Sequence, residues 1–231
     1  MNYTETSNIG EVVAQDYKTA SVFKTNKIDF CCNGNRTISD AAKKKNIDIS
    51  LLINELEIAS KTRSDDGIDF NSWPVDLLAD YIQKIHHKYV AEKLPIILQF
   101  LDKLRKVHGG NNPELYKVYE LFEGASTELV QHMNKEEFVL FPYARLKAKD
   151  TFDETSTLGN VEDPVEMMKY EHENEGDRFR EIRKLTNDYT LPSEACSTYK
   201  VTYSMLEEFE ADLHKHIHLE NNILFPKLLK Y

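Results

Sequence analysis

The chain has 231 residues, of which 41% are hydrophobic, and its 29 basic and 39 acidic side chains give a formal net charge of −10. A charge of this sign repels phosphate backbones, so the composition argues against nucleic acid as a partner. No apolar run is long enough to cross a membrane, and no basic start followed by an apolar stretch marks a secretory signal. The odd number of cysteines (Cys31, Cys32 and Cys196) does not suit a disulfide framework, which predicts a protein of the reducing cytoplasm.

Residues 1–60 predict a small helical N-terminal domain. Short helices are expected near residues 9–17 and 20–24, a third opens with a capping-box pattern at Thr37, and Ser50 is expected to cap a fourth. The loop 29–35 carries the adjacent pair Cys31 and Cys32. Residues 61–74 are polar and end in Trp-Pro, which predicts a linker.

Residues 75–231 predict four long amphipathic helices. We expect them at about 75–107, 114–149, 163–189 and from 193 to the end, with a polar stretch at 150–163 between the second and third. Helices of this length with short connections favour an up-down-up-down bundle. The predicted fold class is therefore all-α, a four-helix bundle preceded by a small helical domain.

The second and fourth of these helices share one spacing pattern. It runs Leu129, His132, Glu136, Leu140, Phe141, Pro142 in the second and Leu213, His216, Glu220, Leu224, Phe225, Pro226 in the fourth. So long a gapped match indicates two helical hairpins related by duplication. Residues four apart lie on the same side of a helix, so each His and Glu point together from an apolar face.

Each preceding helix adds a histidine at a matching distance. His172 lies 44 residues before His216, and His87 lies 45 before His132, although the periodicity of its helix does not choose between His86 and His87. His214 and His218 lie two residues either side of His216, about 200° around the helix, and are expected at the surface. Glu171 is expected to be an exposed helix charge, with an acid that supports a metal ligand as the alternative, and Cys196 is expected to be packed.

Buried carboxylates and imidazoles that converge in a bundle core predict a metal. Turning a carboxylate into the core costs several kcal/mol unless it is paired or bound to a cation. Four His and two Glu exceed the needs of one tetrahedral zinc, so the set predicts a dinuclear centre. Mixed imidazole and carboxylate ligands with open positions suit iron, while manganese and zinc stay open as alternatives. A lone His on an apolar face is more often an ordinary core residue, but the repeat argues against that reading here.

The bundle pattern resembles the haemerythrin-like domain family. Three segments carry a closer resemblance, to the RIC family of iron–sulfur cluster repair di-iron proteins (ScdA, YtfE and DnrN type). The segments are Asp29-Phe30-Cys31-Cys32-Asn33-Gly34, Thr37-Ile38-Ser39-Asp40-Ala41-Ala42 and His216-Ile217-His218-Leu219-Glu220-Asn221-Asn222-Ile223-Leu224-Phe225-Pro226. The resemblance places the family's metal ligands on His87, His132, Glu136, His172, His216 and Glu220. Asn33 departs from the pattern, because a Gly is common there.

The resemblance implies two non-haem iron ions, oxo- and carboxylate-bridged. It implies repair of iron–sulfur proteins damaged by nitric oxide or peroxide, by donation of iron, with Cys31 and Cys32 passing metal, sulfur or nitrosyl groups. Two buried, purely structural cysteines are the alternative. It also favours a homodimer.

Three other functions stay open at this point. The bundle could bind nitric oxide or dioxygen as a store or sensor, reduce nitric oxide or peroxide as a redox enzyme, or be a structural bundle without metal. The sequence contains no GxGxxG or phosphate-binding loop, so a redox enzyme would take its electrons from a partner. Whether the chain is an enzyme is left undecided.

Overall fold

The computed structural model of the chain describes residues 3–61, 68–149 and 161–230. Within these ranges the regular elements are helices and there is no strand, which confirms the all-α prediction. Residues 62–67 of the predicted linker and 150–160 of the predicted polar stretch lie outside the described residues. No helix in the described part is both long enough and apolar enough to cross a membrane. The chain divides into two compact units, residues 1–78 with 217–231 and residues 79–216.

The first unit combines short N-terminal helices with the C-terminal end of the chain. Its elements are α1 (Ile9–Gln15), α2 (Thr19–Thr25), α3 (Ile38–Lys45), α4 (Ile49–Lys61), the 3-10 turn η1 (Phe70–Ser72), the start of α5 (Val75–Tyr81), the last residues of α10, the π-helical segment η4 (Glu220–Leu224) and α11 (Phe225–Leu229). α2 packs against α4, and α1 packs against η4. This unit therefore joins residues from the two ends of the chain in one core.

Local capping explains where two of these helices begin. The Thr37 hydroxyl accepts the Asp40 N–H at 3.1 Å, so the predicted cap of α3 is confirmed. The predicted cap of α4 by Ser50 is wrong. The Asp48 carboxylate accepts the Leu51 N–H at 3.0 Å, and Ser50 lies inside the first turn.

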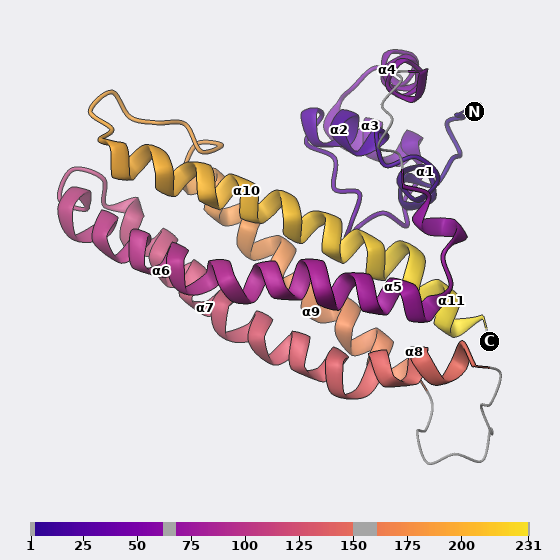
Figure 1. Cartoon of the computed structure of the whole chain (residues 1–231). Helices are drawn as coiled ribbons and strands as arrows, with labels where there is room; N and C mark the ends of the chain where they lie inside the picture. The colour runs from indigo at the N-terminus through magenta and orange to yellow at the C-terminus, as the bar shows by residue number, and fades with distance from the viewer. Residues whose placement is uncertain (1–2, 62–67, 150–160, 231) are drawn as a thin grey trace. The chain divides into compact units, whose positions relative to one another are not determined.

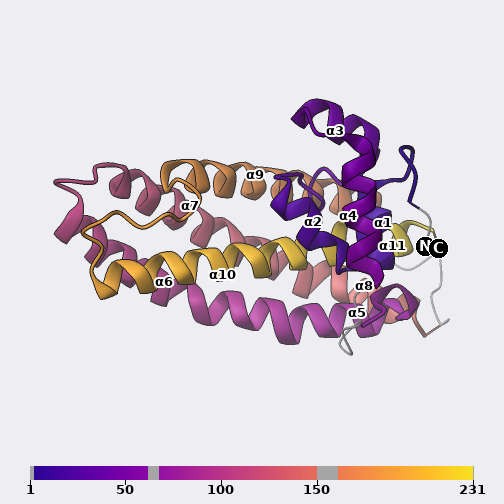
Figure 2. The same cartoon turned by 90° about the horizontal axis from the view of Figure 1, so that it is seen from above.

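The second unit contains the four long helical runs of the bundle. The first run comprises the end of α5, the π-helical segment η2 (Ile82–His87) and α6 (Lys88–His108), and the second comprises α7 (Glu114–Lys135), the π-helical segment η3 (Glu136–Leu140) and α8 (Phe141–Lys147). The third run is α9 (Glu162–Leu185), and the fourth is α10 (Ser197–Leu219) up to His216. Figures 1 and 2 show α6, α7, α9 and α10 side by side from two directions, and α7 packs against both α6 and α9. The up-down-up-down bundle is confirmed.

Three aromatic rings in mutual contact lie in the core of this bundle. Phe122 of α7, Phe179 of α9 and Phe209 of α10 are fully buried, and the ring centroids of Phe122 and Phe209 lie 5.4 Å apart. Those of Phe179 and Phe209 lie 5.8 Å apart. Such contacts stabilise a core beyond the area that they bury. The three helices are thereby fixed at the level next to the predicted ligands.

Each His-x3-Glu segment runs into a π-helical turn, and a proline supplies the reason. Pro142 and Pro226 lack the N–H that would bond to residues 138 and 222 in an α-helix. The preceding N–H groups, of Phe141 and Phe225, instead bond five residues back to the carbonyls of Glu136 and Glu220. Each glutamate therefore begins a widened turn, a feature that recurs at functional sites.

The ends of the third and fourth helices differ from the prediction. α9 begins at Glu162, so Asp163 lies in its first turn instead of capping it. α9 ends at Leu185 instead of near Tyr189, because Asn187, Asp188 and Tyr189 all have positive φ and turn the chain out of the helix. α10 begins at Ser197, four residues later than predicted.

Candidate metal centre

The six predicted ligands are all less than 5% exposed. They are His87 at the end of η2, His132 in α7, Glu136 at the start of η3, His172 in α9, His216 in α10 and Glu220 at the start of η4. Glu220 follows His216 by one turn of the same continuous helical run, so both side chains project from one helix face. Every helical run of the bundle contributes at least one of these residues.

The ligand-type atoms form two overlapping groups. One contains His87 and His216 and the other His132 and His172, while Glu136 and Glu220 belong to both. Within each group the candidate atoms all lie within 4.8 Å of one another. Both groups consist of buried imidazole and carboxylate donors, which are ligand types that bind metal cations.

Glu136 lies close to a histidine of each group. Its Oε2 lies 3.3 Å from His87 Nε2 and 3.4 Å from His132 Nε2. The Nε2 atom of His132 is in turn 2.9 Å from His172 Nε2. The ring centroids of His87 and His216 lie 5.0 Å apart.

Two further carboxylates hold these imidazoles from outside. Glu137 Oε1 lies 2.8 Å from His87 Nδ1, and Glu171 Oε2 lies 2.8 Å from His132 Nδ1. Glu171 is also paired with the Lys135 ammonium. The hydrogen bond from His132 lowers the pKa of Glu171 to about 2, and the contact with Lys135 acts in the same direction. Glu171 is therefore an ionised partner of a ligand histidine, and its predicted role as an exposed charge is wrong.

These outer contacts fix which ring nitrogen is available for a metal. A carboxylate accepts the Nδ1 proton, which leaves Nε2 of the neutral imidazole as the lone-pair atom directed at Glu136. A lone pair directed at a carboxylate oxygen is repulsive without a proton or a metal cation between them. Carboxylate–histidine pairs of this kind are the usual second layer around a bound metal. The residues present therefore fit a metal centre.

His86 and His87 are both buried, but they make different contacts. His87 belongs to a ligand group, whereas His86 Nδ1 lies 2.9 Å from Asp212 Oδ1 and its ring stacks on that of His216 at 5.6 Å. The widened turn of η2 carries both residues. His86 therefore supports the position of His216 from one side.

His218 corrects the surface prediction for its helix. It is 1% exposed, and its ring lies 5.8 Å from those of Tyr17 and Phe30. Burial lowers the pKa of His218 to about 3, so the ring is neutral at physiological pH. The Asn222 side-chain amide donates to His218 Nδ1 at 3.0 Å. Tyr17, in the turn before α2, and Phe30, in the cysteine loop, cover the ring.

Asn222 anchors the cysteine loop to the C-terminal helix. Its amide nitrogen lies 3.3 Å from the carbonyl oxygens of both Phe30 and Cys31. A Cβ at Gly10 would lie 2.2 Å from Asn222 Oδ1, and one at Gly34 would lie 3.0 Å from it. Only glycine at these two positions leaves room for the Asn222 side chain.

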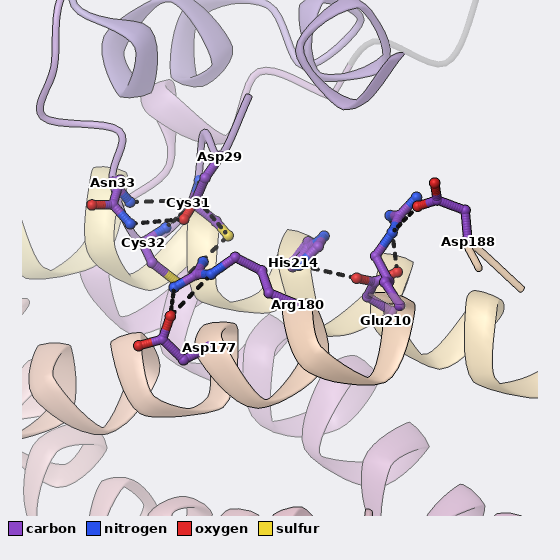
Figure 3. A network of polar contacts seen from close by, with 10 residues as sticks. Asp29, Cys31, Cys32, Asn33, Asp177, Arg180, Asp188, Glu210 and His214 are labelled. Atoms are coloured by element: carbon purple, nitrogen blue, oxygen red, sulfur yellow. Dashed lines mark hydrogen bonds and ion pairs between the residues drawn. The ribbon is translucent and has the colours of Figure 1, made fainter. Parts of the chain in front are cut away.

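The predicted cysteine pair lies in this anchored loop, shown in Figure 3. Cys31 is buried and Cys32 half-buried, and neither forms a disulfide. Their sulfur atoms lie 3.7 Å apart. Cys196, by contrast, is exposed and not packed as predicted, with its sulfur 3.3 Å from His108 Nε2. Hydrogen bonds from the Tyr199 backbone and from His108 lower the pKa of Cys196 to about 7.

Comparison with known proteins agrees with this geometry. Residues 78–228 match the family described as "Hemerythrin HHE cation binding domain", and residues 5–60 match ScdA_N, described as a domain of unknown function (DUF542). The class of the protein is thus a haemerythrin-type cation-binding helical domain with a small N-terminal helical region.

Two relatives that match almost the whole chain identify the family more specifically. The iron–sulfur cluster repair protein ScdA of Staphylococcus epidermidis is 32% identical over 97% of this chain and 99% of its own length. The iron–sulfur cluster repair protein YtfE of Pectobacterium atrosepticum is 33% identical over 100% of this chain and 99% of its own. The chain belongs to this ScdA/YtfE family of iron–sulfur cluster repair proteins.

Proposed function

We propose that the chain holds two iron ions between His87, His132, Glu136, His172, His216 and Glu220, and donates iron to iron–sulfur proteins damaged by nitrosative or oxidative stress. One observation carries the proposal. Two ligand groups, each with two imidazoles, share the same two buried carboxylates. A carboxylate that belongs to both groups would be able to contact an ion in either of them, so Glu136 and Glu220 would serve a pair of ions.

The chemistry of the donors favours iron. Imidazole and carboxylate together suit iron with open coordination positions, and two shared carboxylates with two imidazoles per ion leave such positions. Iron held there supplies exchangeable metal and a place where nitric oxide or dioxygen binds. The protein's own residues hold the imidazoles: Glu137 and Glu171 keep Nδ1 protonated and Nε2 directed inward.

The names of the relatives support repair over the alternatives. ScdA and YtfE are both named as iron–sulfur cluster repair proteins, and neither gas storage nor a redox reaction is part of those names. In this proposal Cys31 and Cys32 receive or pass groups during repair, residues 1–60 form the small domain and residues 75–231 the bundle. The chain acts in the cytoplasm as a homodimer.

Iron transfer tests the proposal directly. The chain is loaded with iron, mixed with an iron–sulfur enzyme whose cluster nitric oxide has damaged, and the recovery of enzyme activity is followed together with the iron left on the chain. We expect recovery in step with iron loss from the chain. His132→Ala should take up little iron and give no recovery, whereas Glu207→Gln, an exposed acid on α10, should match the wild type.

Two outcomes would contradict this function. One is recovery by the iron-free His132→Ala variant at the wild-type rate. The other is recovery by the wild type without loss of iron from the chain. Sustained turnover of nitric oxide or peroxide with an electron donor would favour an enzyme instead.

A further inference from the structure

The cysteine loop places a third group of metal-ligand atoms in the first unit of the chain. Asp29, Cys31 and Cys32 each offer one ligand atom, and these atoms all lie within 4.8 Å of one another. All three residues belong to one short loop, so the group needs no other part of the chain. We propose that this loop is a separate site for one thiophilic metal ion, held by Cys31 Sγ, Cys32 Sγ and an Asp29 carboxylate oxygen.

The distances match those that one tetrahedral ion requires. Bonds of about 2.3 Å to sulfur and 2.1 Å to oxygen place two sulfur ligands about 3.8 Å apart, and a sulfur and an oxygen about 3.6 Å apart. The two cysteine sulfurs are 3.7 Å apart, and Cys31 Sγ is 3.4 Å from Asp29 Oδ1. These two distances differ from the tetrahedral values by only a few tenths of an ångström, and the third, between Cys32 Sγ and an Asp29 oxygen, is at most 4.8 Å.

Asp29 gives the loop this shape. Its Oδ1 accepts the backbone N–H groups of Cys31 at 3.1 Å and Cys32 at 3.0 Å, which folds the two residues around the carboxylate. The Asn33 side-chain amide holds Asp29 Oδ2 at 2.8 Å. Figure 3 shows these contacts converging on Asp29. Asn33, the departure from the family pattern, thus takes part in orienting the proposed ligand.

The surroundings hold the loop rigidly in this shape. The side-chain amides of Asn221 and Asn222 both donate to the Cys31 carbonyl, at 3.2 and 3.3 Å. Phe30 is buried beside them, with its ring edge-on to that of Tyr17 at 6.3 Å. A site whose ligands are fixed before binding loses little conformational entropy when the ion enters.

Thiophilic metals fit this donor set better than calcium or magnesium. Two thiolates select soft or borderline ions such as cadmium, zinc, copper(I) or iron(II). A hydrogen bond to Cys32 and burial raise the pKa of Cys31, so this thiol is protonated at neutral pH before the metal binds. Binding forms two metal–sulfur bonds and one metal–oxygen bond, and each thiol that carries a proton releases it to solvent.

Three protein donors leave one position of a tetrahedral ion open. Cys32 and Asp29 are half-buried, so two of the three ligand residues keep some exposure to solvent. A ligand of an acceptor protein can occupy that position while the loop still holds the ion. This last role rests on the proposed function, in which iron leaves the chain for a damaged protein.

Cadmium titration of the full-length, iron-loaded and reduced chain tests the site. Iron occupies the histidine–glutamate group, and cadmium bound to thiolates shows a sulfur-to-metal charge-transfer absorption that imidazole and carboxylate ligands do not give. We expect one cadmium ion per chain, with release of protons from the thiols. Cys31→Ser and Cys32→Ser should each weaken binding at least 100-fold and reduce the absorption per ion by about half.

Two variants separate the proposed site from simpler explanations. Asp29→Asn keeps an oxygen for the two backbone N–H groups but loses the charge, and should weaken binding about tenfold with an unchanged circular dichroism spectrum. Cys196→Ser removes the exposed cysteine outside the loop and should bind cadmium as the wild type does.

The proposal is overturned if the wild type shows no thiolate absorption at one equivalent of cadmium. It is also overturned if Cys31→Ser and Cys32→Ser both bind within threefold of the wild type, or if only Cys196→Ser abolishes the signal. Its failure is distinguishable from failure of the proposed function. A cadmium site in the loop of a chain that transfers no iron supports the site and contradicts the repair function, whereas iron transfer without a cadmium site does the reverse.

Discussion

The two His-x3-Glu segments, residues 129–142 and 213–226, have equivalent inner faces and different outer faces. His132 and His216 are both buried, as are the glutamates that follow them. On the outer face, Phe138 is 78% exposed, and the residue at its position in the second segment is the half-buried Asn222. Asn134 is likewise exposed, and its counterpart His218 is 1% exposed.

The cover over the second segment explains this difference. Tyr17 and Phe30 pack on His218, and Asn222 is inserted beside Gly10 and Gly34. One helix therefore presents candidate metal ligands on one face and an anchor for the cysteine loop on the other. The comparison teaches that the two segments share the buried ligand face, whereas other residues cover the opposite face in the second segment only.

The largest expected effect on stability comes from His218, on the covered face of the second segment. His218→Ala should lower the free energy of unfolding by about 2–4 kcal/mol, because it removes a buried ring and the partner of the Asn222 amide. Asn134→Ala, at the matching exposed position, should change it by less than about 0.5 kcal/mol. Urea unfolding of both variants measures the difference, and equal effects would show that the two outer faces are alike.

Substitution of Glu171, the carboxylate that contacts the candidate ligand His132, tests the role of the ligand face in metal binding. Glu171→Gln should weaken iron binding about 10- to 100-fold, because His132 loses the ionised partner that directs Nε2 inward. Glu173→Gln, an exposed acid two residues along α9, is the matched control. Iron affinity is measured by competition with a chelator, and an unchanged affinity for Glu171→Gln would mean that the contact does not support a ligand.

A buried acid outside the repeat provides a pH-dependent contrast. Burial raises the pKa of Glu175 to about 7, from an ordinary value of 4.5, although Arg178 opposes the shift. The folded chain therefore binds this proton more tightly than the unfolded chain, and the free energy of unfolding should fall by about 2 kcal/mol as the pH rises from 5 to 8. Glu175→Gln should lose this part of the pH dependence. If both proteins show the same slope, the carboxyl group does not titrate as described.

The smallest effect concerns the glycines around Asn222. Gly10→Ala should destabilise the chain by about 1–2 kcal/mol, because the new methyl group displaces the Asn222 side chain from its hydrogen bonds. Gly110→Ala is the control, since a Cβ there has no atom within 4 Å. Thermal unfolding compares the two, and a stable Gly10→Ala variant would show that Asn222 is not held as tightly as its contacts indicate.

The four long helical runs and the two His-x3-Glu segments could be predicted from the sequence. Helical periodicity located the four long runs, and the duplicated His-x3-Glu spacing picked out residues that the structure groups together. The choice of His87 over His86 came only from the family resemblance, because the π-helical turn buries both. Helix ends were less predictable, since three consecutive residues with positive φ follow α9.

Contacts between helices could not be predicted from periodicity. Glu137 and Glu171 each stand next to a candidate ligand in sequence, but each binds a histidine of a different helix. Adjacency to a ligand was the only available signal, and it is shared by many surface acids. His218 was predicted at the surface but is buried, because its ring contacts Tyr17 and Phe30, about 200 residues earlier in the sequence.

The central claim is that two cations share the carboxylates of Glu136 and Glu220. The most direct test is the iron content of the purified chain and of Glu136→Ala, together with a spectrum that detects magnetic coupling between two ions. The account predicts two coupled iron ions per chain in the wild type and loss of the coupled pair in the variant. A single uncoupled ion in the wild type, or a coupled pair that survives Glu136→Ala, would contradict it.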